Sequence, residues 1–253
     1  AGFLDRLAAG RLHGILQAQP RGFLPQQFPH HQRPRRVGAR ALRGHRPMEL
    51  TERDREILLT LTHKVRLLSL DQIARSWWPS SSPGAARARL SALPALLHRL
   101  TLNAHPELTL PGPLFTWRPG APTPPFGALS YRLKKRWNQA VKPTTVYIAS
   151  DKAARYFGGC GGKLRRPLQA THDLHVAQIY LRLLKADPAL AALWVSEERF
   201  APERRREKLP DAVLRDAAGN LILVIEFGGA YDAKHVERVH LDCVTRSLPY
   251  ELW

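Results

Sequence analysis

The sequence contains few cysteines and no long apolar run. Its two cysteines, Cys160 and Cys243, are far apart and match no metal or redox spacing, so a reduced, cytoplasmic setting is expected. No apolar run approaches the roughly 20 residues that a membrane span needs. The first residues form a poor signal peptide, because Asp5 and Arg6 interrupt their short apolar stretch. We therefore expect a soluble, cytoplasmic protein without a membrane partner.

Acidic residues are also too few to balance the basic ones. The chain has 39 Lys and Arg against 21 Asp and Glu, which gives a formal net charge of +18 and a pI near 10.8. Such a charge favours a polyanionic partner, most often nucleic acid, with a generally basic surface as the alternative. The hydrophobic content of 44% excludes wholesale disorder, and a length of 253 residues favours two domains.

Residues 1–47 differ from the rest in composition. Nine Arg and one Asp give them +8, which leaves 30 basic and 20 acidic residues, or +10, for the remainder. Prolines interrupt any periodicity, and the run Arg33-Pro34-Arg35-Arg36 is typical of a disordered arm. Met48, the only methionine, stands directly before the first well-patterned helix. Two interpretations stay open: a basic arm that grips phosphates, or sequence upstream of the true start codon.

Residues 48–119 have the pattern of a winged helix-turn-helix. Thr51 caps a first helix that has acidic residues in its first turn, and Ser69 caps a second, short helix. A serine-rich turn leads to a third helix, predicted from Gly84 to Leu100, with arginines on its polar side. Pro94 lies inside that pattern and would end or kink the helix.

A hairpin is expected after the third helix, with strands at 102–105, 107–110 and 114–118 forming the wing. In such a module the third helix enters the major groove and the wing touches the DNA backbone. Serine hydroxyls and guanidinium groups can bind phosphate and guanine there, although arginines on a helix are more often a solvated face. The candidate DNA contacts are Ser81, Ser82, Arg87, Arg89, Arg99 and Arg118.

Residues 120–166 connect this module to the rest of the chain. The proline-rich run 119–125 is a stiff linker and marks the predicted domain boundary. Lys134-Lys135-Arg136 lies between aromatic residues, where phosphate contact is one interpretation and a solvated helix face the more common one. The glycine-rich run 158–163 lacks the spacing of a phosphate-binding P-loop and is expected to be a flexible loop.

Residues 167–253 predict a mixed α/β domain. An amphipathic helix opens at Thr171, and a second helix is expected at 233–245. Between them lie strand patterns at 193–200, 212–215 and 221–227, of which the last two form a hairpin.

The order of these elements resembles the PD-(D/E)xK nuclease superfamily. Asp211 and Glu226 match its two carboxylate positions, which in those enzymes hold a hard divalent cation. Gly228 stands where the superfamily has its lysine, and Lys208 or Lys234 would have to replace that lysine in space. Cleavage with Mg²⁺ or Mn²⁺ and a nuclease-like scaffold without activity both stay open, and the scaffold is favoured.

Four histidines in the same domain raise the question of a further metal site. Histidines on amphipathic helices are more often packing or surface residues, and no Cys/His spacing supports a site here. The four are His172, His175, His235 and His240.

Several short motifs, taken in order, resemble the replication-relaxation family of bacterial plasmids and other mobile elements. They are the opening Leu50-Thr51-Glu52-Arg53-Asp54, then Thr171-His172-Asp173-Leu174-His175, Leu209-Pro210-Asp211-Ala212 and Val224-Ile225-Glu226-Phe227. The resemblance covers most of Met48–Trp253. It implies DNA binding in plasmid replication, relaxation or mobilisation, and it carries over to single residues only at Asp211 and Glu226.

The sequence thus predicts an α+β protein with an N-terminal winged helix-turn-helix and a nuclease-like C-terminal domain. The expected function is double-stranded DNA binding, directed by sequence or structure, without a cofactor. The alternatives are a metal-dependent DNA endonuclease and a transcriptional regulator or protein-interaction scaffold. Besides DNA, a replication or mobilisation protein and a second copy of the chain stay open as partners.

Overall fold

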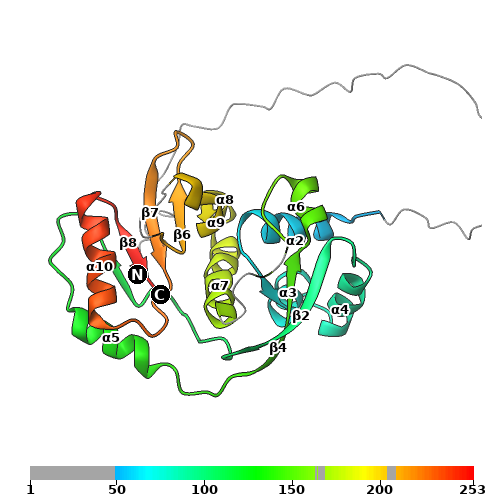
Figure 1. Ribbon diagram of the computed structural model, residues 1–253, viewed down its shortest axis with the longest axis horizontal. Coiled ribbons are helices and arrows are strands. Elements are labelled where there is room, and N and C mark those ends of the chain that lie inside the picture. The colour runs from blue at the N-terminus through cyan, green and yellow to red at the C-terminus, as the bar shows by residue number, and fades with distance from the viewer. Residues whose placement is uncertain (1–48, 163, 165–168, 204–208) are drawn as a thin grey trace, which may run out of the picture.

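The computed structural model describes residues 49–162, 164, 169–203 and 209–253, and the basic segment 1–47 lies outside them. Helices and strands are mixed along the chain and form two separate sheets, which confirms the α+β class. Figure 1 shows helix α7 (Ala170–Ala186) between the two sheets, with one half of the molecule on either side. Within the described residues, no helix is both long enough and apolar enough to cross a membrane.

The first half is built on a three-stranded antiparallel sheet with the order β1-β4-β2. Helix α6 (Asp151–Phe157) follows the last of these strands and packs on the first helix. The elements before α6 are α2 (Glu52–His63), β1 (Leu68–Ser69), α3 (Leu70–Trp77), α4 (Pro83–Ser91), β2 (Leu97–Ala104) and, after a long connection, β4 (Lys142–Ala149).

Local caps set the starts of α2 and α3, as the sequence predicts. The Thr51 hydroxyl accepts the Asp54 N–H at 3.3 Å, and the Asp54 carboxylate accepts the Thr51 N–H at 2.8 Å. Ser69 and Gln72 form the same reciprocal pair at the start of α3. Each pair satisfies two N–H groups that a helix start leaves without partners.

The third helix is shorter than predicted. Helix α4 ends at Ser91, and Leu97–Leu100, expected to be its last turn, begin strand β2. Pro94 explains the difference, because it has no N–H to donate and its ring clashes with the carbonyl four residues earlier. Arg99 therefore lies on a strand and not on the helix.

The hairpin expected at 102–118 is wrong. Strand β2 pairs with β4 along its whole length, from Leu97 opposite Ala149 to Ala104 opposite Lys142. The connection 105–141 instead carries β3 (Phe115–Trp117) and α5 (Phe126–Lys135) into the other half. The boundary expected after residue 119 therefore does not separate the halves, because the chain crosses between them on both sides of it.

The second half has a five-stranded sheet with the order β3-β8-β7-β6-β5, in which β7 and β8 run parallel and the other neighbours antiparallel. The predicted helices and the β6–β7 hairpin are confirmed, whereas the strand expected at 193–200 ends at Ser196 and continues as a short helix. After α7 come α8 (Pro188–Ala192), β5 (Trp194–Ser196), α9 (Glu197–Phe200), β6 (Ala212–Arg215), β7 (Leu221–Glu226), α10 (Ala233–Thr245) and β8 (Tyr250–Leu252).

Successive residues of β6 and β7 face two different cores, as the alternation of a strand requires. Leu214 and Ile225 belong to the core that contains the residues of α7. Val213 and Val224 belong to the other core, which contains Leu133 of α5 together with residues of α10. The sheet is therefore covered by helices on both faces.

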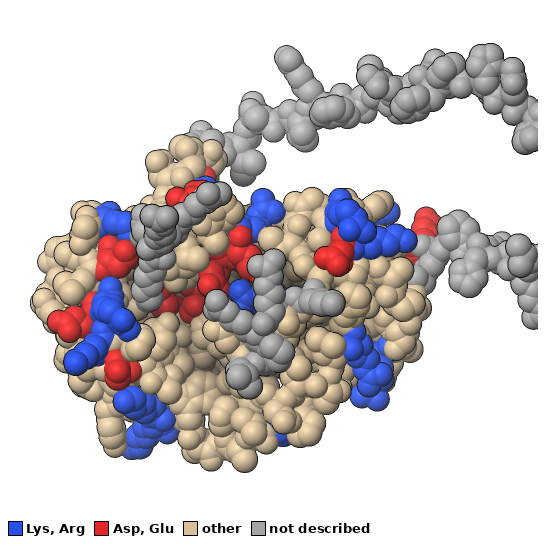
Figure 2. Space-filling model, in the orientation of Figure 1, with Lys and Arg blue, Asp and Glu red and all other residues tan. Residues whose placement is uncertain are grey.

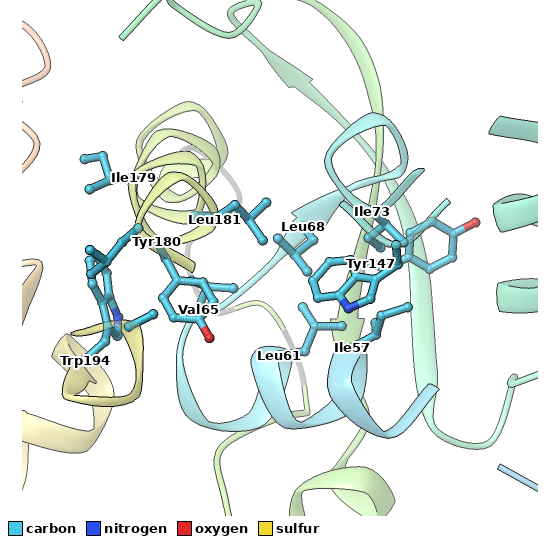
Figure 3. Packing of buried hydrophobic residues seen from close by; sticks show 14 of the residues in the cluster. Ile57, Leu61, Val65, Leu68, Ile73, Tyr147, Ile179, Tyr180, Leu181 and Trp194 are labelled. Atoms are coloured by element: carbon cyan, nitrogen blue, oxygen red, sulfur yellow. The ribbon is translucent and has the colours of Figure 1, made fainter. Parts of the chain in front are cut away.

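One apolar core joins the two halves. Ile57 and Leu61 of α2 and Tyr147 of β4 lie in the same cluster as Tyr180 of α7 and Trp194 of β5 (Figure 3). Hydrogen bonds run across the same junction. The indole N–H of Trp194 donates to the carbonyl of residue 64 at 2.9 Å, and the ammonium group of that lysine donates to the carbonyl of Trp194 at 2.9 Å.

The glycine-rich run at 158–162 is tightly packed, which differs from the expected flexible loop. A Cβ at Gly159 would stand 2.2 Å from the carbonyl oxygen of Thr62. The N–H of Cys160 donates to the same oxygen at 2.7 Å. Glycine is required because only a residue without a side chain allows this approach to the end of α2.

Candidate functional site

Helix α4 and strand β2 present the first group of predicted contact residues. Ser81 and Ser82 are exposed at the start of α4, and Ser82 is its N-cap without a side-chain cap bond. Arg87 is exposed on α4 and Arg99 on β2. The first turn of α4 contains no acidic residue, so the partial positive charge of its N-terminus is not compensated by a carboxylate of its own.

Arg99 lies next to Tyr147 of β4. The two residues are directly opposite each other in the β2–β4 ladder, and Tyr147 is 1% exposed. Burial raises the pKa of the Tyr147 hydroxyl, whereas the positive charges of Arg99 and Arg87 lower it. Within the described part of the chain the hydroxyl has no hydrogen-bond partner, and Figure 3 shows it pointing away from the apolar cluster.

Two other predicted contact residues do not join this group. The Nε of Arg89 donates to both carboxylate oxygens of Asp54, at 3.0 and 3.1 Å, and its Nη2 donates to the carbonyl of Glu49. Because Asp54 is fully buried, this ion pair fixes α4 on α2. Arg118 follows β3 and therefore belongs to the sheet of the second half.

Asp211 and Glu226 meet at one end of the β6–β7 hairpin. Ala212 pairs with Ile225, so the register places Asp211 opposite Glu226, one step beyond the ladder. Asp211 accepts the N–H of Phe227 at 2.7 Å. The carboxylate of Glu226, buried at the strand end, accepts the hydroxyl of Tyr231 at 3.2 Å. We call this group the carboxylate centre.

The carboxylate centre changes the protonation of its neighbours. Burial raises the pKa of the Tyr231 hydroxyl, and the charges of Glu226 and Asp211 raise it further. For His172, burial lowers the pKa, but the carboxylates of Asp211 and Asp173 outweigh it and raise the pKa to about 10. The imidazole is therefore protonated at neutral pH, and its Nε2 pairs with Asp211 at 3.1 Å.

Arg66, from the first half, lies beside the carboxylate centre and binds three further carboxylates. Its Nη1 donates to both oxygens of Asp173, at 3.0 and 3.1 Å. Its Nη2 reaches Glu197 at 3.1 Å and its Nε reaches Glu198 at 3.0 Å. Burial disfavours the charged guanidinium, but the three carboxylates prevail and raise the pKa of Arg66. The residue just after α2 is thus tied to α7 and α9 across the junction of the halves.

The described residues do not form a ready site for a divalent cation. No group of three or more His, Cys, Asp or Glu among them is arranged to hold a metal ion. The space left beside Arg66 and Asp211 is about 30 Å³, enough for a water molecule or two but not for an ion that keeps several waters, as Mg²⁺ does. The carboxylates also already accept hydrogen bonds within the protein, so we derive no step through a metal.

Gly228 stands at the position of the superfamily's lysine, and packing explains the glycine. A Cβ there would lie 2.8 Å from both methyl groups of Leu133 and 3.0 Å from a methyl group of Leu252. A side chain at this position would require the buried side chains of Leu133 and Leu252 to shift. Lys234 is exposed on α10, and Lys208 lies outside the described residues.

The histidines other than His172 have packing or surface roles. His175 is fully buried, stacks on Phe227 at 4.8 Å and accepts the N–H of Leu108 through Nε2. Burial lowers the pKa of His175 to about 4, so it is neutral and serves as an acceptor. His240 packs edge-on against Trp117, and His235 pairs with the cap residue of its own helix.

Charge is distributed unequally between the two halves. Residues 49–104 and 142–168, which belong to the first half, contain 14 basic and 6 acidic residues, whereas 105–141 and 169–253 contain 16 basic and 14 acidic ones, so their net charges are +8 and +2. Figure 2 shows acidic side chains gathered in the middle of one face, while basic side chains lie mainly toward its two ends and are interspersed with acidic ones at one end. The first half is therefore the more attractive one to a polyanion.

No family model matches the chain, and the comparisons with curated proteins and with solved structures found no significant match.

The sequence patterns did not predict the roles of Arg66, Tyr147 and Tyr231. Arg66 lies 107 positions from Asp173, and no local signal links residues so far apart. Tyr231 follows Glu226 by five positions, and the glycines between them were the one hint of a turn that folds it back.

Proposed function

We propose that the protein binds double-stranded DNA through a winged helix-turn-helix formed by α2, α3, α4 and the β1-β4-β2 sheet. The order helix, strand, helix, helix, strand, strand, with the last strand between the other two, is that of a winged helix. The observation that carries the proposal is the exposure of Arg87 on helix α4 together with Arg99 on strand β2, which follows that helix. Net charge supports it, because most of the basic excess lies in this half.

Helix α4 is the element expected to enter the major groove. Its nine residues span about 13 Å, enough to contact a few successive base pairs. Ser81 and Ser82 at its start would bind backbone phosphates, Arg87 a base edge or phosphate, and Arg99 the adjacent backbone. We assign the process to replication, relaxation or mobilisation of a mobile element on the motif resemblance alone.

Fluorescence anisotropy with a labelled duplex tests this proposal. The variant Arg87→Gln plus Arg99→Gln removes two phosphate-binding cations, so we expect affinity to fall about 30-fold at 0.15 M salt. The slope of log K against log salt should become shallower by about 1.8. An exposed pair on α6, Lys152→Gln plus Arg155→Gln, is the charge-matched control and should bind as the unaltered protein does. Equal affinity of both variants would refute the assignment.

A metal-dependent DNA endonuclease at Asp211 and Glu226 is the second candidate. The register that sets these two carboxylates opposite each other favours it. The ion pair of Asp211 with His172 and the packing of Gly228 argue against it. Cutting of plasmid DNA with Mg²⁺ or Mn²⁺ that Asp211→Ala abolishes would establish the nuclease, and no cutting with either ion would reject it.

A further inference from the structure

A basic groove lies between the end of α5 and the segment 107–114. It has a volume of about 640 Å³, and Arg132, Lys135 and Arg136 line one side of it. The acidic residue in its lining, Glu107, pairs with Arg75. The groove therefore carries an excess of positive charge that its own lining does not neutralise.

Arg136 is a partly buried cation with which no Asp or Glu side chain of the described residues pairs. Its Nη2 donates to the carbonyl of Trp253 at 2.8 Å, and its guanidinium lies 4.8 Å from the centre of the Phe227 ring. Its Nε is buried and has no hydrogen-bond partner in the described part of the chain. Burial lowers the pKa of Arg136 to about 10, and no carboxylate counteracts it, so a charged group remains unpaired at neutral pH.

Arg132 and Lys135 extend the same positive surface to the solvent. Both are exposed, and their spacing of three residues places them on one face of α5. Among the described residues, neither has a carboxylate within ion-pair distance. An unpaired guanidinium, beside two solvated cations in a hollow, is the chemistry that binds phosphate.

The position of the groove relates it to both functional regions. Helix α5 lies in the connection between β2 and β4, where a winged helix has its wing. Phe227, whose ring Arg136 covers, donates its N–H to Asp211, so the groove adjoins the carboxylate centre. In Figure 2, basic side chains gather near α5 at one end of the face and near α4 and β2 at the other.

We propose that this groove binds backbone phosphates of the same duplex that α4 holds, with Arg132, Lys135 and Arg136 as the phosphate-binding residues. The connection between β2 and β4 then serves as an enlarged wing and forms a second DNA contact surface. The inference rests on the proposed DNA binding and adds to it a site on the second half of the molecule.

The test is duplex binding by Arg132→Gln plus Lys135→Gln in the full chain, measured by anisotropy over a range of salt concentrations. Both positions are exposed, so the variant should fold, and unchanged thermal unfolding verifies this. We expect affinity to fall about 30-fold at 0.15 M salt and the salt slope to become shallower by about 1.8. Lys152→Gln plus Arg155→Gln, with the same residue types and spacing on α6, should stay within twofold of the unaltered protein.

The outcomes separate this inference from the proposed function. If the unaltered protein binds and Arg87→Gln plus Arg99→Gln weakens it, while the α5 variant matches the α6 control, the groove proposal fails and α4 remains the DNA contact. If the unaltered protein shows no salt-dependent binding, both proposals fail. A loss confined to the α4 and α5 variants supports both.

Discussion

Arg66 beside the carboxylate centre and Arg136 in the groove at the end of α5 have the same guanidinium group in different surroundings. Arg66 has three carboxylates around it, which raise its pKa, whereas Arg136 has none among the described residues, and burial lowers its pKa to about 10. The first guanidinium is satisfied within the protein and holds the two halves together. The second has a buried Nε–H without an acceptor in the described part of the chain. The comparison teaches that a positive charge marks a binding surface only where the fold has not already neutralised it.

Removal of the Arg66 guanidinium should have the largest effect on stability. Arg66→Met leaves Asp173, whose side chain is 5% exposed, with only the His172 imidazolium at 3.4 Å as a cation, and we expect a loss of about 2–4 kcal/mol. Urea unfolding of the full chain measures it. Arg136→Met is the comparison and should lose about 1 kcal/mol, since it breaks a carbonyl hydrogen bond but no ion pair. A larger loss for Arg136→Met than for Arg66→Met would contradict the contrast.

Glu251 is a buried acid with no cation beside it among the described residues, so it is the acidic counterpart of Arg136. Its ionisation makes stability depend on pH. Burial raises its pKa to about 7, although the Trp253 indole donates to it at 3.0 Å. The folded state then binds a proton that the unfolded state releases above its ordinary pKa of 4.5. Stability should therefore fall as pH rises from about 4.5 to 7, by up to about 3 kcal/mol.

The variant Glu251→Gln isolates this titration. The variant should not lose stability as pH rises through this range. Its free energy of unfolding should therefore exceed that of the unaltered protein at pH 8, and the difference should vanish near pH 4. Urea titrations at a series of pH values compare the two proteins. Parallel pH profiles would contradict this prediction, because they would show that Glu251 has the same pKa in the folded and unfolded states.

Gly228 stands where the nuclease pattern has its lysine, and a substitution there tests whether packing requires the glycine. Gly228→Ala puts a methyl group against Leu133 and Leu252, and overpacking of this kind costs about 1–3 kcal/mol. Gly127, exposed on α5 with nothing within 4 Å of an added Cβ, is the matched control. Gly127→Ala should stabilise by about 0.5–1 kcal/mol, because alanine favours a helix. Thermal unfolding of both variants measures the two changes in stability. Equal shifts in Tm would contradict the expected overpacking at Gly228.

The features that the sequence predicted correctly are local ones. Thr51 and Ser69 cap their helices through residues three positions away, so the pattern and the contact lie in the same short window. The β6–β7 hairpin was predicted as well, but an irregularity between Leu214 and Arg215 shifts its register by one residue, and Asp211 lies opposite Glu226 because of that shift. Pro94 shows how one residue outweighs an apolar stripe, because the stripe of leucines around it favoured a longer helix.

The features that the sequence did not predict depend on contacts between distant segments. The pairing of β2 with β4 spans the connection 105–141, and the turn residues inside that connection wrongly suggested a nearer partner. Arg89 looked like a DNA contact until the fold placed it against Asp54, 35 positions earlier. A side chain's charge can be read from the sequence, whereas its neutralisation depends on the tertiary structure.

The most direct test of the central claim is the salt dependence of duplex binding by the unaltered full chain. Arg87, Arg99, Arg132, Lys135 and Arg136 would together displace about five counterions, so log K should fall linearly with log salt with a slope of about −4.5. A slope of that size, reduced by about 1.8 in either double variant, agrees with two phosphate-binding surfaces. Binding that does not respond to salt, or no binding at all, would contradict the account.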